Sequence, residues 1–261
     1  MKHVDHLMLI IALGLILSIS ACQLESLNDP IVVADIENEF YIDMWETAAA
    51  VNNLQVLVET IEDETCLNAE IEATSLKRPN AIQIQINDIL EPDDCIEGAA
   101  PATAQLELGN LPVGIYDFSI ELKSTIFNNG QFTVTPERYQ LEMESEDGII
   151  LVRSQLLRIP KETFWGYVNY EAGAEGLAES FLEDLRTLTI PTNFLRGYYG
   201  YFTVNNEVND VTVTSQPADF TLQSFVHQYE RTEQDKIIDL VENYRQEGLE
   251  IWLQNDLGEL L

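Results

Sequence analysis

The chain has 261 residues, with 45 Asp and Glu against 13 Lys and Arg, so its formal charge at pH 7 is -32. Hydrophobic residues make up 46% of it, a share that supports a folded core and excludes wholesale disorder. Nucleic-acid binding is excluded because it needs clustered Lys and Arg, and none occurs between Gln23 and Leu76. The charge is typical of a solvated, self-repelling surface.

The first 21 residues are predicted to be a signal peptide. Lys2 precedes an apolar run from Leu7 to Ile19, and the small residues Ser20 and Ala21 follow, which is the order of a secretory signal. The run is too short to span a bilayer. We expect residues 22–32 to be a polar tether to the folded part of the chain.

Ile19-Ser20-Ala21-Cys22 resembles the lipobox of bacterial lipoproteins, with an aliphatic residue, two small residues and a cysteine. The resemblance implies cleavage before Cys22, a diacylglyceryl thioether on its sulfur and acylation of the new N-terminus, so that Cys22 anchors the protein to a membrane. Gln23 after the cysteine resembles the signal for release to the outer membrane. The resemblance therefore implies an exported protein of the bacterial cell envelope.

The two other cysteines, Cys66 and Cys95, are predicted to form one structural disulfide, since an exported chain with two spare cysteines most simply pairs them. They do not form the Cys-x-x-Cys motif of redox-active pairs. Zinc binding is disfavoured, because two cysteines and one histidine of the mature chain fall short of four ligands.

Residues 33–159 are predicted to form an antiparallel β-sandwich. Ile82, Ile84 and Ile86 alternate with polar residues, as do the apolar residues between Tyr116 and Leu122, so each run has one buried and one solvated face. Asn128-Asn129-Gly130 is typical of a hairpin turn. The segment from Ile36 to Asn53 fits either an edge strand or a helical turn.

Residues 160–261 are predicted to form an α+β domain of ferredoxin-like type, with the element order β-α-β-β-α-β. Leu177 to Leu188 recur at helical spacing, and Thr232 and Asp235 resemble a capping box that opens a second helix. Gly248 stands where a helix C-cap is expected. Strand patterns cover 164–170, 198–204, 220–229 and 249–254.

In such a domain helices cover one face of the sheet, and strand parity assigns an aromatic set to the other face. The residues assigned to this open face are Trp165, Tyr167, Tyr199, Tyr201, Phe225, His227, Tyr229 and Trp252. The face is either the core between the two domains or an exposed platform for a glycan or an envelope protein. His227 is the one histidine after residue 22, and it is more typical of packing than of catalysis.

Two acidic segments flank the predicted disulfide. They contain Glu62, Asp63 and Glu64 before Cys66, and Asp93 and Asp94 before Cys95. A bond between the cysteines brings the segments together, and a calcium site of carboxylate oxygens is a hypothesis for them. Their spacing matches no EF-hand loop, and no other cofactor is indicated.

The leading hypothesis for function is non-catalytic binding or assembly at the cell envelope. The chain contains no nucleophile elbow, zinc-binding helix or phosphate loop, so no catalytic residue is assigned. One alternative is an envelope hydrolase with two catalytic carboxylates, which requires a cleft where two acids approach within about 5 to 10 Å. The other is a purely structural lipoprotein.

Overall fold

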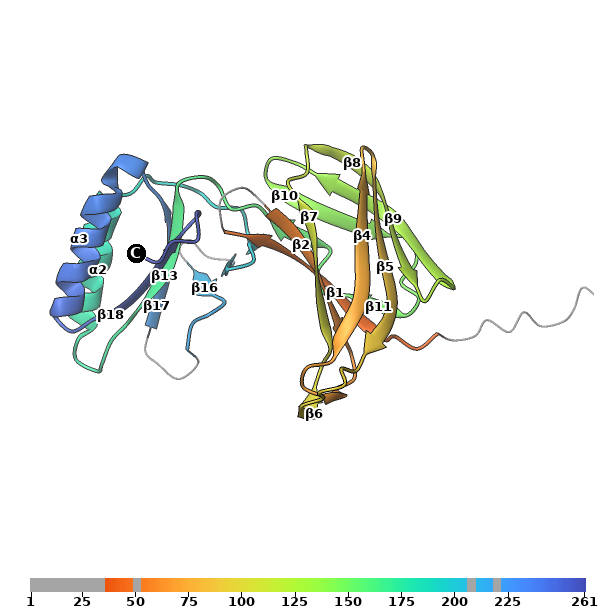
Figure 1. Ribbon diagram of the computed structural model, residues 1–261. Coiled ribbons are helices and arrows are strands. Elements are labelled where there is room, and N and C mark those ends of the chain that lie inside the picture. The colour runs from red at the N-terminus through yellow and green to blue at the C-terminus, as the bar shows by residue number, and fades with distance from the viewer. Residues whose placement is uncertain (1–35, 49–52, 206–209, 218–221) are drawn as a thin grey trace, which may run out of the picture. The chain divides into compact units, whose positions relative to one another are not determined.

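A computed structural model describes residues 36–48, 53–205, 210–217 and 222–261, and the described part is mostly β-structure (Figure 1). The predicted signal peptide, the tether and the lipidation site Cys22 lie outside the described residues. Residues Glu37–Leu261 form one compact unit. Within the described ranges, no helix is long and apolar enough to cross a membrane.

Ten strands form one continuous mixed sheet that curls into a half-barrel (Figure 1). In the order in which they pair, they are β11 (Ile149–Leu151), β1 (Phe40–Thr47), β2 (Asn53–Thr60), β7 (Thr103–Gly109), β4 (Glu70–Arg78), β5 (Ala81–Leu90), β8 (Gly114–Leu122), β9 (Ile126–Val134), β10 (Arg138–Met143) and β12 (Gln155–Leu157).

The curl of this sheet follows from its two edge strands, β11 and β12, which are neighbours in the sequence. Leu151 ends one edge and Gln155 begins the other. Four peptide steps span at most about 14 Å, so the two edges must come this close to each other. The backbone of the connection supports both edges, because the amide of Val152 donates to the carbonyl of Ile42 and the amide of Leu141 donates to the carbonyl of Ser154.

The predicted alternation of buried and solvated residues is confirmed inside the curled sheet. Ile82, Ile84 and Ile86 of β5 are buried, and so are the apolar residues of β8 from Tyr116 to Leu122. β5 and β8 pair in parallel, which places Ile84 opposite Ile120. For Ile36 to Asn53, the strand alternative is confirmed for Phe40–Thr47, whose inward residues are buried.

The predicted antiparallel sandwich is wrong in two respects. The strands form one curled sheet instead of two stacked sheets, and three of the pairings are parallel: β1 with β11, β4 with β7, and β5 with β8. Alternation in a sequence shows which face of a strand is buried, but it contains no information about the neighbouring strand or its direction.

The predicted hairpin turn at Asn128-Asn129-Gly130 is also misplaced, since these residues lie inside β9. The turn lies before them at Lys123 and Ser124, which both have positive φ, of 48° and 55°. Gly130 has a packing role, because a Cβ there would lie 2.4 Å from the carbonyl oxygen of Glu142 on β10. The buried Asn128 holds the loop at Asp147 through two hydrogen bonds of 2.8 Å.

The C-terminal segment is built around a three-stranded antiparallel sheet with strand order β17-β13-β18. Its elements are β13 (Thr163–Asn169), β17 (Leu222–Gln228) and β18 (Glu250–Asn255), with α2 (Glu175–Thr187) and α3 (Gln234–Gln246) packed against one face (Figure 1). A second small sheet contains β14 (Gly197–Tyr198), β15 (Phe202–Val204) and β16 (Val211–Val213), and β3 (Glu64–Cys66) pairs with β6 (Glu97–Ala100).

The predicted ferredoxin-like domain is therefore wrong. It requires the residues around 198–204 to join the helix-covered sheet, but they form β14 and β15, which pair with each other and, through β15, with β16 in the separate small sheet. The sheet consequently has three strands among the described residues, and β17 stands at its edge. This difference creates the site described below.

The two described helices lie where their spacing predicts, although one of the two predicted ends of α3 is wrong. Thr232 does not cap α3, which follows a 3₁₀ turn over Arg231–Glu233 and has no side-chain cap. Gly248 does end the helix, with φ of 107°, and its amide donates to the carbonyl of Arg245 while that of Leu249 donates to the carbonyl of Tyr244. These two bonds form a Schellman motif.

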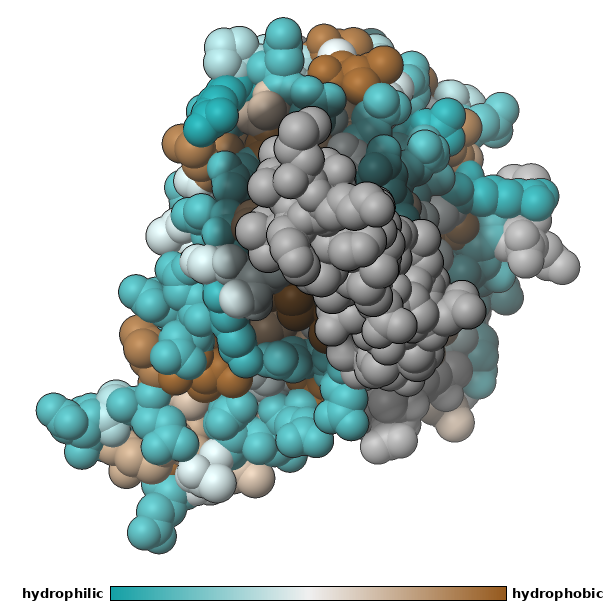
Figure 2. Space-filling view, turned by 90° about the vertical axis from the view of Figure 1, so that its right-hand side faces the viewer, coloured by the Kyte–Doolittle hydropathy of each residue, from teal (hydrophilic) through white to brown (hydrophobic). Residues whose placement is uncertain are grey.

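A buried carboxylate joins β1 to β10. The Tyr139 hydroxyl donates a 2.8 Å hydrogen bond to Oε1 of Glu46, and Nε of Arg158 lies 3.6 Å from the same oxygen. Burial raises the pKa of Glu46 above its ordinary value, while Tyr139 and Arg158 oppose that change. Figure 2 shows the face that lies at the right of Figure 1, where hydrophilic residues cover most of the described surface and hydrophobic residues occur in separate patches.

Candidate functional site

The aromatic set assigned to the open face is divided by the structure into three groups. The first group is on the face of the three-stranded sheet opposite the helices. Trp165 and Tyr167 of β13 lie there with Trp252 of β18, because Tyr167 pairs directly with Trp252 in the sheet register. The rings of Tyr167 and Trp252 are stacked with their centroids 5.7 Å apart, and both side chains are partly exposed.

The second group, Phe225, His227 and Tyr229, lies on the helix-covered face. The register places Phe225 opposite Gly166 and His227 opposite Phe164, and Phe164 packs with Phe225 and Tyr229 in the core beneath the helices. The predicted parity of this strand is thus shifted by one residue, and a shift of one residue moves every side chain of a strand to the other face.

The third group, Tyr199 and Tyr201, lies in the turn between β14 and β15 of the small sheet and packs in one hydrophobic cluster with Trp165. The rings of Tyr201 and Trp165 lie 5.1 Å apart, and Tyr201 also lies 4.7 Å from Trp45 of β1. The amide of Ala48 donates a 3.0 Å hydrogen bond to the Tyr201 hydroxyl. Trp165 is fully buried as a result. Most of the predicted open face is a hydrophobic core, and of the set only Tyr167 and Trp252 form an accessible aromatic pair on that face.

A groove of about 870 Å³ runs along the edge of β17, at a place that the sequence did not indicate. One wall is β17 itself, from Leu222 to His227, and the other walls come from the end of α2, the segment Thr189–Arg196 and the residues around β15 and β16. Its volume lies within the range of small-molecule and peptide sites.

The groove follows an open sheet edge. At its end the amide of Ile190 donates to the carbonyl of Gln228, in a single antiparallel bridge. Pairing stops there, and the next residue, Pro191, has no amide hydrogen to continue it. Since backbone groups alternate between the two sides of an antiparallel strand, those of Ser224 and Val226 point to the same side as the Gln228 carbonyl. Both residues line the groove.

Several polar side chains of the lining are held in place by hydrogen bonds. The Ser224 hydroxyl donates to Oε1 of Gln216 at 2.6 Å, and the Thr192 hydroxyl donates to Oε1 of Gln228 at 2.8 Å. Asn205 donates to Asp210 at 3.2 Å. These bonds orient the polar groups of the walls before any ligand arrives.

The charge of the groove differs from that of the chain as a whole. Two of the 13 basic residues, Arg186 and Arg196, line it, and neither forms an ion pair with another described residue. Asp210 is the one carboxylate among the described lining residues. In the sequence, Arg186 and Arg196 are the only basic residues between Lys161 and Arg231, but the sequence does not indicate that the two lie in one groove.

His227 lines the groove in its neutral form at neutral pH. Burial lowers the pKa of its imidazole to about 4, and the nearby charge of Arg186 acts in the same direction. A general base works best when its pKa is close to the pH of the reaction, so His227 is poorly suited to that role. The paired carboxylates that glycoside hydrolysis needs are not found among the described lining residues either.

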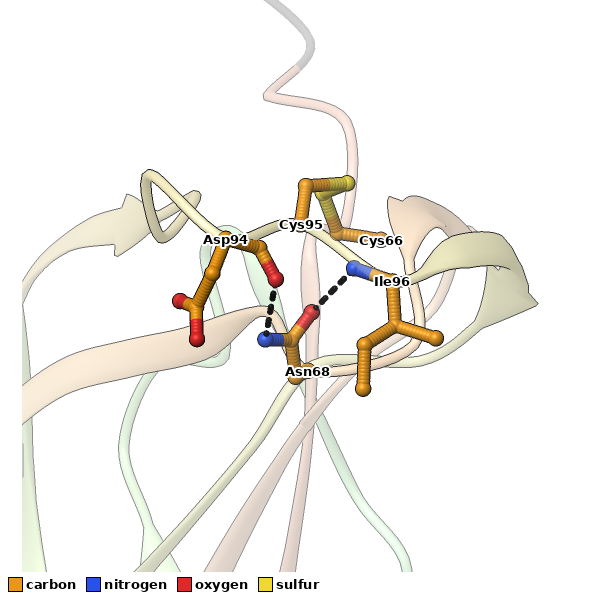
Figure 3. Close-up of a disulfide and its surroundings, with 5 residues drawn as sticks. All are labelled: Cys66, Asn68, Asp94, Cys95 and Ile96. Carbon is orange, nitrogen blue, oxygen red and sulfur yellow. Dashed lines mark hydrogen bonds between the residues drawn. A yellow bond between two sulfur atoms is a disulfide. The ribbon is translucent and has the colours of Figure 1, made fainter.

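The predicted Cys66–Cys95 disulfide is confirmed, with Cα atoms 5.4 Å apart. Asn68 connects the two bridged segments: its side chain donates to the carbonyl of Asp94 and accepts from the amide of Ile96, as Figure 3 shows. The carboxylate of Asp94 points away from the disulfide (Figure 3). The disulfide and the hydrogen bonds of the Asn68 side chain thus join the two segments without any contact from the acidic side chains.

The acidic residues proposed for calcium do not converge. The antiparallel register places Cys66 opposite Glu97 and Glu64 opposite Ala100, so Glu62, Asp63 and Glu64 extend in one direction while Asp93 and Asp94 lie in the other. In the part of the chain that the structure describes, no three His, Cys, Asp or Glu side chains are grouped to hold a metal ion.

No protein-family model, curated protein or solved structure gives a significant match to this chain.

Proposed function

We propose that this chain is a lipid-anchored protein of the bacterial cell envelope that binds a ligand without catalysis, in the groove along β17. The lipobox-like sequence before Cys22 supports the anchor, and the Cys66–Cys95 disulfide is consistent with an exported chain. The expected ligand is a glycan or a segment of another envelope protein.

The observation that carries the proposal is the groove itself. It combines a volume of about 870 Å³, pre-oriented polar side chains and apolar residues such as Phe194 and Val226. Concave sites with a few fixed polar groups on an apolar lining are the usual form of binding sites. The groove has neither a second described carboxylate nor a base of suitable pKa, and this favours binding over hydrolysis.

The test is a thermal-shift screen of the chain from Gln23 onward, which retains the whole compact unit Glu37–Leu261. The panel contains oligosaccharides and short peptides, and each hit is confirmed by titration calorimetry. The groove is then filled with Asn193→Trp, since Asn193 lines it and makes no side-chain hydrogen bond to a described residue. Asn80→Trp, in the exposed β4–β5 turn, is the matched control.

We expect Asn193→Trp to abolish binding of the hits, while Asn80→Trp binds like the natural chain. Equal affinity in the natural chain and in Asn193→Trp would show that the ligand binds elsewhere and would contradict the proposed site.

A further inference from the structure

We propose that the groove binds an acidic peptide segment in extended conformation, which adds to β17 as a fourth strand of the sheet. This inference rests on the proposed function, because it names the ligand class of the same groove. It combines two observations, the open backbone edge of β17 and the two arginines beside it.

The backbone of β17 offers hydrogen bonds to such a strand. Ser224 and Val226 direct their amide and carbonyl groups to the side on which Ile190 already bonds Gln228, and no described backbone group pairs with them there. Peptides commonly bind by extending an exposed sheet edge in this way, with affinity from main-chain hydrogen bonds. The bridge at Ile190 shows that an antiparallel segment fits this edge.

The arginines select the charge of the peptide. Arg186 at the end of α2 is well placed to interact with the carbonyls of that helix, but this role does not account for Arg196, which precedes Gly197 in another wall. Guanidinium groups favour carboxylates through paired, charge-assisted hydrogen bonds. A basic peptide would meet these two charges in the groove, whereas an acidic peptide would neutralise them.

The groove also suits the side chains of a strand. Alternate side chains of an added strand would point to opposite faces of the sheet. One side offers Val226 and Val211, and the other offers Phe225 and His227, with the charge of Arg186 beside His227. A segment in which Glu alternates with an aliphatic residue therefore matches both the apolar lining and the arginines.

The experiment measures fluorescence anisotropy of a labelled pentapeptide, Glu-Val-Glu-Val-Glu with blocked ends, titrated with the chain from Gln23 onward. Four comparison peptides are used: one with Gln in place of Glu, one with Lys in place of Glu, and two that are N-methylated at alternate backbone amides, one for each of the two possible registers. N-methylation keeps the side chains and removes the amide donors of one edge. A neutral oligosaccharide serves as a competitor.

We expect at least one of the two N-methylated peptides to bind about 10-fold or more weakly than the Glu peptide, because it lacks main-chain hydrogen bonds to β17. The Lys peptide should be weakened by a similar factor, because its positive charges are repelled by Arg186 and Arg196. Val226→Pro removes one edge amide and should weaken binding similarly, whereas Val226→Ala keeps the amide and should bind much more tightly than Val226→Pro. Proline is accepted on edge strands whose amide faces solvent.

Arg186→Gln together with Arg196→Gln should weaken binding of the Glu peptide by about 10-fold and leave the Gln peptide little changed, while Arg138→Gln, on an exposed site of β10, should have no effect. Unchanged binding of the N-methylated peptides in both registers overturns strand addition. Equal binding of the Glu and Lys peptides overturns the selection for acidic segments.

These failures are distinguishable from failure of the proposed function. If Asn193→Trp blocks a neutral oligosaccharide while no peptide binds, the groove is a glycan site and the present inference is wrong. If Asn193→Trp blocks no ligand at all, the proposed function itself is wrong.

Discussion

The pKa of His227 is determined by the groups that surround its imidazole ring. Its ring packs 5.8 Å from Phe164 and 6.1 Å from Phe225, and the charge of Arg186 lies nearby. Burial and the positive charge both disfavour the protonated ring, and the pKa falls from 6.5 to about 4. Folding and protonation of this residue are therefore coupled.

The stability of the folded chain should depend on pH through His227. Because the folded pKa of His227 lies below the unfolded one, the unfolded chain binds a proton between about pH 6.5 and 4 that the folded chain does not bind. The stabilisation is present above about pH 6.5 and is lost as the pH falls through this interval. When the pH falls from about 7.5 to about 4.5, the unfolding free energy of the natural chain should decrease by about 1 to 3 kcal/mol more than that of His227→Gln.

Urea unfolding of both proteins at about pH 7.5 and about pH 4.5 measures this difference. The raised pKa of Glu46 has the opposite effect, since its contribution is lost as the pH rises, but it is common to both proteins and cancels in the comparison. The same difference between the two proteins at both pH values would contradict the prediction.

At the level of single residues, the sequence predicted burial well where a strand has a clear period of two. Trp165, Tyr167 and Trp252 share the predicted face, because β13 and β18 alternate without interruption. β17 could not be phased in the same way. Its residues Phe225, Val226 and His227 are all compatible with a buried face, so apolar character alone did not determine which of them faces the helices.

At the level of elements, the end of α3 provides the second prediction. Gly248 has φ of 107°, a conformation that an L-residue adopts at a cost, and a Cβ there would meet no atom within 4 Å. Gly248→Ala should therefore destabilise the chain by about 1 kcal/mol through backbone strain alone.

Gly176 in the first turn of α2 is the matched control, since a Cβ there also meets no atom within 4 Å but its φ is that of a helix. Gly176→Ala should stabilise the chain by about 0.5 to 1 kcal/mol. Thermal unfolding of the two variants beside the natural chain measures both effects. Equal effects of the two substitutions would mean that the positive φ of Gly248 has no energetic role.

The positions of most strands and of both described helices were predictable, because local periodicity determines them. The pairing of the strands was not, because it depends on contacts between distant residues. The segment Tyr198–Val204 has the alternation of one strand, but a turn at residues 199–201 divides it into β14 and β15, which pair with each other, and β15 pairs with β16 instead of β17. The groove exists only because of that pairing, so no local pattern could have revealed it.

At the level of the whole molecule, the disulfide provides the third prediction. The residues between Cys66 and Cys95 contain the hairpin of β4 and β5, which lies in the middle of the ten-stranded sheet. A closed loop with a sequence separation of 29 lowers the entropy of the unfolded chain, and this raises the free energy of the unfolded chain by about 3 to 4 kcal/mol at room temperature. The double variant Cys66→Ala, Cys95→Ala should lose about this much stability.

Urea unfolding of the natural chain with and without a reductant, beside the double variant, measures this loss. The reduced natural chain should resemble the double variant, and the reductant should not change the variant. If the oxidised chain and the variant unfold at the same urea concentration, the disulfide does not stabilise the sheet.

The short connection from Leu151 to Gln155 has a consequence for how the chain folds. Because β11 and β12 complete opposite edges of the ten-stranded sheet, a chain synthesised only as far as Gly148 has both edges exposed, and such edges invite pairing with other chains. The pairing of Phe40 with Ile149 joins residues far apart in sequence, and contacts of this kind slow folding. Both edges therefore stay open to other chains until this single segment is in place and covers them together.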